Sequence, residues 1–194
     1  MKDTRTLIEI SLLVALAYVL QLFAIWYSRF FWPQGGSVSI SLVPMAIIAY
    51  RHGAKLGLMA GIVYGVLSMT LAAAPLIHWL RVLLDFFFPL MGAAFIIGLW
   101  SKKIAAKEGL SIGVDVWLST AIASLWRFVS HYLSGLWFFY MFAPEGVGMH
   151  IYSLVYNLPQ QLFNWLICAP ILVVLLKRYN FGKVAYKGMP STLR

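Results

Sequence analysis

The sequence predicts an all-α integral membrane protein with six transmembrane helices and with both termini in the cytoplasm. Of its 194 residues, 62% are hydrophobic and only 11% are charged, which leaves too little polar surface for a soluble domain of this size. The mean hydropathy is +0.84, and several apolar runs are long enough to cross a bilayer of about 30 Å. The length suits a single membrane domain that occupies residues 1–194.

Six apolar runs are expected to span the membrane. They cover roughly residues 6–27, 40–50, 56–73, 77–100, 116–140 and 151–176. The first run is too long for the core of a signal peptide. The second is short and contains Pro44, which is tolerated where neighbouring helices satisfy the freed backbone groups. Around the start of the third, Gly53, Gly57, Gly61 and Gly65 recur at every fourth residue and predict close helix packing.

The basic residues lie in alternate connections between these runs, which sets the orientation. The residues on the side of the termini are Lys2, Arg5, Arg51, Lys55, Lys102, Lys103, Lys107, Lys177, Arg178, Lys183, Lys187 and Arg194. Because basic loops stay in the cytoplasm, both termini are expected there, in the cell membrane of a bacterium. The net charge of +9 therefore reflects topology and not nucleic-acid binding. Asp115, at the inner edge of the fifth run, is expected to be solvated.

Polar groups gather in the outer half of the predicted bundle. Asp85 precedes three phenylalanines, Arg127 and His131 lie one helical turn apart, and Asn157 begins the sixth run. Ionisable residues within spans are costly and usually functional. A carboxylate among aromatic rings suits a small aromatic cation, so the residues predict an outward-facing binding pocket. Arg81, one turn before Asp85, is expected to pair with it or to extend to the membrane surface.

Other kinds of site receive little support from the sequence. A membrane hydrolase would need Ser134 with His131, since Ser130 is adjacent to the histidine, and no nucleophile elbow is present. His131, Asp85 and His150 lack the spacing of metal ligands. The sequence has no P-loop, so ATP hydrolysis would require a partner. We expect a binding protein, not an enzyme, without metal or cofactor.

Several short motifs, taken in order, resemble one transporter family. They are PQGGSVSI (33–40), YRHGAKLGL (50–58), the LLD before Phe86, RFVSHYLSG (127–135) and FAPEG followed by IYSLVYN (151–157). Together they resemble the thiamine-specific S-component, the ThiT family, of energy-coupling factor (ECF) transporters. The resemblance implies a subunit that captures thiamine at the extracellular side. It would deliver the vitamin through a shared module of one transmembrane coupling subunit and two ABC ATPases. An S-component for another vitamin or precursor, such as a pyrimidine or biotin, is the alternative.

The resemblance also implies roles for individual residues at the two ends of the ligand. Asp85 matches an acidic residue near the thiazolium ring. His131 and Asn157 match residues that hold the aminopyrimidine, and Tyr152 and Ser153 match the pair beside it.

Further residues would complete the pocket and the docking surface. Arg127 and Gly135 match residues that line the pocket, Tyr64 and Phe139 match aromatic residues, and Trp32 lies near the position of a tryptophan in the lid. Ser11 and Ala15 fall on the small-xxx-small motif through which the family docks on the coupling subunit. Pro75 replaces a tyrosine of the family, so the contacts of the lid are expected to differ.

Overall fold

The computed structural model describes residues 2–33, 35–71, 78–107 and 110–179, and all secondary structure in these ranges is helical. Pro75 lies outside the described residues. The elements in order are α1 (Lys2–Ser28), α2 (Leu42–Ser68), η1 (Met69–Leu71), α3 (Trp79–Val82), η2 (Leu83–Phe87), α4 (Phe88–Leu99), α5 (Ser101–Ala105), α6 (Leu110–Ser134), η3 (Gly135–Phe139), η4 (Tyr140–Phe142) and α7 (Met149–Tyr179).

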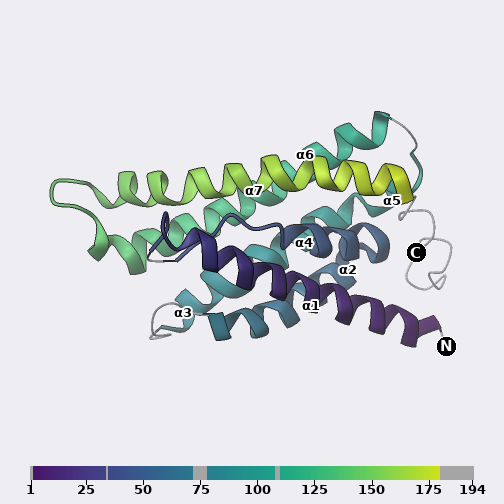
Figure 1. Ribbon diagram of the computed structural model, residues 1–194, viewed down its shortest axis with the longest axis horizontal. Coiled ribbons are helices and arrows are strands. Elements are labelled where there is room, and N and C mark those ends of the chain that lie inside the picture. Colours follow the sequence, from purple (N-terminus) through teal and green to yellow (C-terminus); the bar gives the residue numbers. More distant parts are fainter. Residues whose placement is uncertain (1, 34, 72–77, 108–109, 180–194) are drawn as a thin grey trace.

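Five helical stretches in the described residues are long and apolar enough to cross a membrane. They are Thr4–Ser28, Leu42–Leu71, Trp79–Leu99, Ser111–Phe142 and Met149–Arg178. The stretches form an elongated bundle in which α1, α6 and α7 run along most of its length (Figure 1). The predicted all-helical membrane class is therefore confirmed.

Most of the second and third predicted spans belong to the single element α2 (Leu42–Ser68), which is broken at Gly53. This glycine has φ 83° and ψ 179°, a conformation that side chains with a β-carbon disfavour. A β-carbon added to Gly57 would lie 3.2 Å from that of Ala49, whereas residues eight apart in a straight helix are separated by about 12 Å. The chain therefore folds back on itself at Gly53, and one residue replaces the expected loop. The count of six membrane crossings remains a prediction.

The returning half of α2 packs closely against α4 through its glycines. A β-carbon on Gly57 would lie 2.9 Å from the carbonyl oxygen of Ala94, and one on Gly61 would lie 2.9 Å from the backbone nitrogen of Met91. Both distances are shorter than real contacts, so the backbones meet directly. The glycine repeat therefore acts in helix packing, as its spacing predicts.

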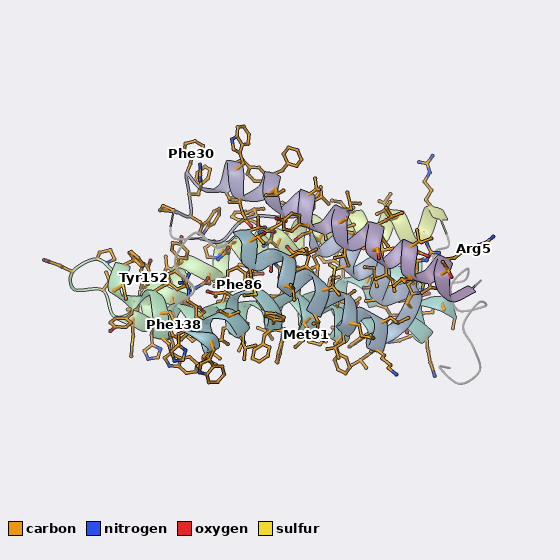
Figure 2. All side chains as sticks on the ribbon, turned by 90° about the horizontal axis from the view of Figure 1, so that it is seen from below. Arg5, Phe30, Phe86, Met91, Phe138 and Tyr152 are labelled. Atoms are coloured by element: carbon orange, nitrogen blue, oxygen red, sulfur yellow. The ribbon has the colours of Figure 1, made fainter. Side chains whose placement is uncertain are left out.

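The two ends of the bundle differ in the residues that they carry. Arg5 lies at one end, whereas Phe30, Phe138 and Tyr152 lie at the other (Figure 2). The first end also holds the starts of α1 and α6, helix α5 and the end of α7 (Figure 1). We call it the terminal end, and the opposite end the pocket end.

Asp115 is buried at the terminal end and is not solvated, which corrects the prediction. Its side chain is 3% exposed and pairs with the ammonium groups of Lys103, at 2.7 Å, and Lys107, at 2.6 Å. These lysines lie in and just after α5, whereas Asp115 is on α6. The fold brings the basic connection over the start of α6, and this covers the carboxylate while supplying two opposite charges.

A second group of charges at the terminal end ties α1 to α2. Glu9 pairs with the guanidinium of Arg51 at 2.9 Å, and its carboxylate lies 3.5 Å from the imidazole of His52. Both partners precede the break at Gly53. The contact fixes the start of α1 at the turn between the two halves of α2.

Candidate ligand-binding site

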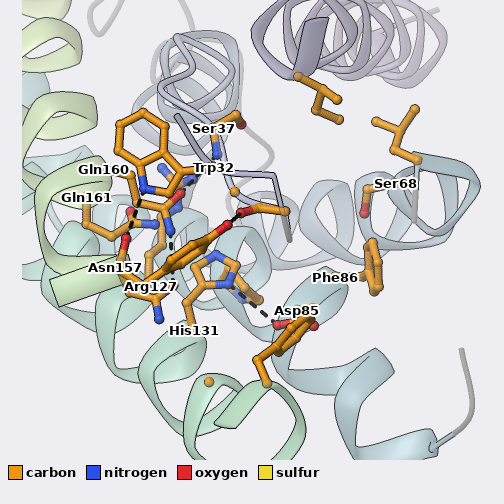
Figure 3. Close-up of a pocket in the computed structure, with 18 of the residues that line it drawn as sticks. Trp32, Ser37, Ser68, Asp85, Phe86, Arg127, His131, Asn157, Gln160 and Gln161 are labelled. Carbon is orange, nitrogen blue, oxygen red and sulfur yellow. Dashed lines mark hydrogen bonds and ion pairs between the residues drawn. The ribbon is translucent and has the colours of Figure 1, made fainter. Parts of the chain in front are cut away.

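A cavity of about 230 Å³ lies at the pocket end, near the lower limit of about 300 Å³ that is usual for small-molecule sites. Figure 3 shows residues that surround it. The lining comes from α1, the connection that follows it as far as Ser37, α2 with η1, α3, η2, the start of α4, α6 with η3, and α7. Elements from the whole length of the chain therefore meet around one space.

One side of the cavity is formed by a non-helical segment, residues 35–41, whose backbone is bound by side chains of α7. The N–H of Ser37 donates to Gln160 Oε1 at 2.9 Å, and the N–H of Ser39 donates to Asn164 Oδ1. In return, Asn164 Nδ2 donates to the Ser37 carbonyl at 3.1 Å, and the Cys168 thiol donates to the Ser39 carbonyl at 3.6 Å. Non-helical backbone at membrane depth requires such partners, so the polar face of α7 replaces the missing helical bonds.

Trp32 closes the cavity next to this segment. Its indole N–H donates to the Tyr156 carbonyl at 3.0 Å, and the Tyr156 hydroxyl donates to the Gly35 carbonyl at 2.8 Å. Gly35 has φ 114° and Gly36 has φ 97°, conformations that are accessible to glycine. The glycine pair lets the chain turn from Trp32 down into the bundle.

The helix that carries Asp85 contains a π-helical turn just before Pro89. Proline has no N–H to continue the helical hydrogen bonds, and the Phe88 N–H reaches back five residues to Leu83. The Leu84 carbonyl, which the Phe88 N–H would bond in an α-helix, accepts instead from the Ser130 hydroxyl of α6 at 2.7 Å. Such turns are frequent at functional sites. A second π-helical turn, η3, lies after α6 and ends at Phe139.

Asp85 stands between two basic side chains in the cavity. Its Oδ2 lies 3.4 Å from Arg81 Nε, and its Oδ1 lies 3.7 Å from His131 Nδ1. The Arg81 guanidinium also lies over the ring of Phe139, 4.7 Å from its centroid. Arg81 is therefore paired inside the bundle, and the alternative expectation, that it extends to the membrane surface, is wrong.

Across the cavity, several buried polar atoms have no hydrogen-bond partner among the described residues. They are Nε and Nη1 of Arg127, the hydroxyl of Tyr152 and Oε1 of Gln161. Arg127 is only 6% exposed, and all three residues line the cavity. Unpaired buried polar groups are unfavourable, so this side of the cavity suits a ligand with both donors and acceptors.

Asn157 lies between these groups and is held by its own helix. Its Nδ2 donates to the Ser153 carbonyl at 2.9 Å, and its Oδ1 accepts from Gln160 Nε2 at 3.0 Å. Gln160 in turn binds the Ser37 N–H, so the orientation of the Asn157 amide is linked to the non-helical segment. Ser153 is fully buried, and its hydroxyl donates to the Tyr132 carbonyl at 2.7 Å.

The structure gathers nine of the ten residues predicted for the pocket around this cavity. They are Trp32, Tyr64, Asp85, Arg127, His131, Gly135, Phe139, Tyr152 and Asn157. Ser153, the tenth, lies behind Asn157 and supports it. Whether these residues bind a ligand remains a prediction.

The arrangement does not resemble that of a hydrolase or a metal site. The Ser130 hydroxyl is bonded to Leu84, and the buried Ser134 hydroxyl has no hydrogen-bond partner in the described part of the chain, His131 included. The described residues also contain no group of three or more His, Cys, Asp or Glu side chains that could hold a metal ion.

Sequence reasoning missed several residues that line the cavity. They include Arg29, Ser37, Phe86, Gln160 and Gln161. The two glutamines were detectable, because they follow Asn157 by three and four residues and so lie on the same helix face. The segment at Ser37 gave no comparable signal, since its position depends on contacts with α7.

Comparisons with known proteins agree with one another. Residues 7–183 match the family model described as "Thiamine transporter protein (Thia_YuaJ)". The chain is 34% identical over 177 residues to "Thiamine transporter ThiT" of Bacillus subtilis, covering 90% of this chain and 91% of that protein. It is also 24% identical over 147 residues to the thiamine transporter ThiT of Lacticaseibacillus paracasei, covering 72% of each chain.

A solved structure supports the fold independently. The structure of ThiT from Listeria monocytogenes superimposes with a TM-score of 0.78 and 24% sequence identity, covering 94% of this chain and 99% of that one. The apolar helices and these relatives identify a multi-pass membrane protein of a bacterium. The extent of the family match and of the identity to the Bacillus subtilis relative shows that the chain belongs to the thiamine transporter family.

Proposed function

We propose that this chain is the thiamine-binding S-component of an ECF-type importer. The observation that supports this most is that two unlike groups of residues line the cavity. Asp85 and the ring of Phe139 both contact the guanidinium of Arg81, whereas Arg127, Tyr152 and Gln161 carry atoms without a hydrogen-bond partner among the described residues. Thiamine also has two unlike parts, because a cationic thiazolium ring is joined to an aminopyrimidine that carries hydrogen-bond donors and acceptors.

In the proposed complex, Asp85 balances the charge of the thiazolium, and Phe139 offers an aromatic face to it. Asn157, Tyr152 and Arg127 bind the pyrimidine, together with His131. Trp32 and Tyr64 enclose the rings. Gly135 allows Asn157 and Ser153 to pack directly against the backbone of η3, and Ser153 acts by supporting that asparagine.

The proposed orientation places the pocket at the extracellular side and both termini in the cytoplasm. The start of α1 and the end of α7 lie together at the terminal end (Figure 1). The basic side chains of the connection after α4 also lie there, in accordance with the distribution of positive charge in membrane proteins.

The first experiment is a titration of intrinsic tryptophan fluorescence in the detergent-purified chain with thiamine. Trp32 lines the cavity, so saturable quenching at nanomolar to low-micromolar thiamine is expected. Asp85→Asn and His131→Ala should each weaken binding more than tenfold, or about 1.4 kcal/mol. Unchanged affinity in both variants would remove the assignment of the site. Stabilisation by a pyrimidine or biotin, but not by thiamine, in a thermal-shift screen would support the alternative vitamin.

We also propose that α1 docks on the transmembrane coupling subunit, which acts with two ABC ATPases. Ser11 and Ala15 are exposed on α1, and each is followed by an exposed leucine, Leu12 and Leu16. Small residues on an exposed helix face allow close approach of another helix.

Ser11→Trp and Ala15→Trp should abolish thiamine uptake by cells that contain the complete transporter, while the isolated variants bind thiamine normally. Leu16→Trp is the matched control for the added bulk, because Leu16 is also exposed on α1 but is turned by about 100° from Ala15 around the helix axis. Equal loss of uptake and binding would show that this face serves folding instead.

A further inference from the structure

We infer that Arg81 is an internal counter-ion that a cationic ligand must displace from Asp85, and that returns to Asp85 when the ligand leaves. This inference rests on the proposed function, since it concerns the same site. It adds a residue that controls selectivity for charge and the release of the ligand.

The guanidinium of Arg81 contacts both groups of the cavity that could bind a cation, which are the Asp85 carboxylate and the Phe139 ring. Its Nε lies 3.4 Å from Asp85 Oδ2. Its central carbon lies 4.7 Å from the centroid of the Phe139 ring. A carboxylate and an aromatic face are the two elements that bind an organic cation, and one side chain of the protein engages both.

The location of Arg81 keeps it at this place when the cavity is empty. Its side chain is 11% exposed and that of Asp85 is 16% exposed, so neither charge has full access to water. Arg81 lies in α3, one turn before Asp85 in η2, whereas Phe139 belongs to η3 after α6. The guanidinium therefore links the two π-helical turns across the cavity.

The pairing predicts different behaviour for charged and neutral ligands. A cationic ligand that pairs with the Asp85 carboxylate must displace the guanidinium of Arg81. The loss of that ion pair offsets part of the binding free energy that the new ion pair contributes. A neutral ligand of the same shape can leave the pair intact. Without Arg81, the neutral ligand would cover a buried carboxylate that has lost one of its two basic neighbours, which is unfavourable.

The ion pair between Arg81 and Asp85 also affects the release of a bound cation. When a bound cation departs, Asp85 would be left with only His131 beside it unless another positive group takes its place. Arg81 is attached one helical turn away and supplies that group. It therefore lowers the barrier for a tightly bound cation to leave, as an importer requires.

The test compares thiamine with its neutral analogue, in which an uncharged thiophene ring replaces the thiazolium. Dissociation constants for both are measured with the wild-type chain and with Arg81→Gln in detergent. The ratio of the two constants, neutral over cationic, should increase at least tenfold in Arg81→Gln. Dissociation of thiamine from the variant should slow at least fivefold.

Arg29→Gln is the matched control, because Arg29 also lines the cavity but, among the described residues, Asp85 pairs with Arg81 and His131. It removes the same charge and should change both affinities by a similar factor. An unchanged ratio in Arg81→Gln, or an equal increase in Arg29→Gln, would overturn the role of Arg81 while leaving thiamine binding established. Absence of thiamine binding to the folded wild-type chain would refute the proposed function itself.

A measurement on the wild-type chain decides the matter if Arg81→Gln does not fold. The Arg81 Nε resonance, labelled with ¹⁵N-arginine and assigned through Arg81→Lys, should shift when thiamine is added and remain in place with the neutral analogue. The same shift with both ligands, or none with thiamine, would contradict displacement of the guanidinium.

Discussion

The terminal end and the pocket end each contain an aspartate among helices, and the two carboxylates differ in their exposure and in their partners: the side chain of Asp115 is 3% exposed and that of Asp85 is 16% exposed. Asp115 contacts two lysine ammonium groups at 2.7 and 2.6 Å. Asp85 lies 3.4 Å from an arginine and 3.7 Å from a histidine. The first carboxylate has close partners on a basic connection, whereas the second has looser partners around an open cavity.

Within the described ranges, buried polar atoms without a hydrogen bond occur at both ends, but at the terminal end Glu9 Oε1 and Asp115 Oδ2 lie in ion pairs with Arg51 and Lys107. Arg127, at the pocket end, has two guanidinium nitrogens without a hydrogen-bond partner among the described residues, although it is only 6% exposed. The difference teaches that buried charge alone does not identify a binding site. A charge with close and sufficient partners is structural, and one with incomplete partners beside a cavity is a candidate for ligand binding.

Removing the structural charge should have the largest effect on stability. Asp115→Asn leaves Lys103 and Lys107 without their common partner, and we expect a loss of about 2 kcal/mol, below the range for fully buried pairs because the lysines are partly exposed. In a thermal-unfolding assay this corresponds to a decrease of roughly 4 to 8 °C. Thiamine affinity should stay within twofold.

The control for this prediction is Lys103→Gln, which removes the more exposed partner, 52% accessible, and leaves Lys107 in place. It should cost less than Asp115→Asn. A large loss of thiamine affinity in Asp115→Asn would break the separation between the two ends.

Filling space at the pocket end should affect binding more than stability. A β-carbon on Gly135 would lie 3.0 Å from Ser153 Cβ and 3.1 Å from Asn157 Nδ2, so Gly135→Ala displaces the asparagine and its support. We expect about a tenfold loss of thiamine affinity, or about 1.4 kcal/mol, measured by fluorescence titration.

Gly113→Ala is the control for this prediction. It lies in the same helical stretch, Ser111–Phe142, and makes the same change from glycine to alanine, so it accounts for the effect of helix propensity alone. Its β-carbon would meet only Val173 Cγ1, at 3.9 Å, and its affinity should match that of the wild type. Equal affinities for Gly135→Ala and Gly113→Ala would show that the contact at Asn157 does not govern binding.

The smallest effect on stability is expected for Arg127, two of whose nitrogens have no hydrogen-bond partner in the described part of the chain. Arg127→Met keeps the length of the side chain and removes a buried charge, so the ligand-free protein should be as stable as the wild type or more stable by up to about 1 kcal/mol. Thiamine affinity should fall. A clear decrease in the unfolding temperature of the ligand-free variant would mean that Arg127 is structural, as Asp115 is.

Much of the fold could be predicted from the sequence, because the lipid bilayer constrains the length and the composition of the helices that cross it. Apolar length predicts the helices, and the glycine repeat predicts the contact between α2 and α4. The break at Gly53 was expected as a loop, since hydropathy reports a polar gap but not its geometry. Asp115 was assigned to solvent because its lysine partners belong to the preceding connection, whose path over α6 the sequence does not give.

Residues of the site could be predicted from the sequence where a polar side chain interrupts an apolar run. Asp85 and His131 meet that condition and line the same cavity. The engagement of Arg81 with Phe139 was not predictable, because it joins residues 58 positions apart through two π-helical turns. The contact between Ser37 and Gln160 spans 123 positions and left no local pattern.

The non-helical segment has a consequence for the order in which the protein is made. The ribosome releases residues 35–41 early, yet Gln160, Asn164 and Cys168, which bind their backbone, are separated from them by 123 to 129 positions. Until α7 is inserted, these backbone groups must remain hydrated, because bare N–H and C=O groups are excluded from the hydrocarbon core. Assembly of the cavity is therefore a late step of biogenesis, and a nascent chain that stops before α7 lacks the side chains that hold this segment in place.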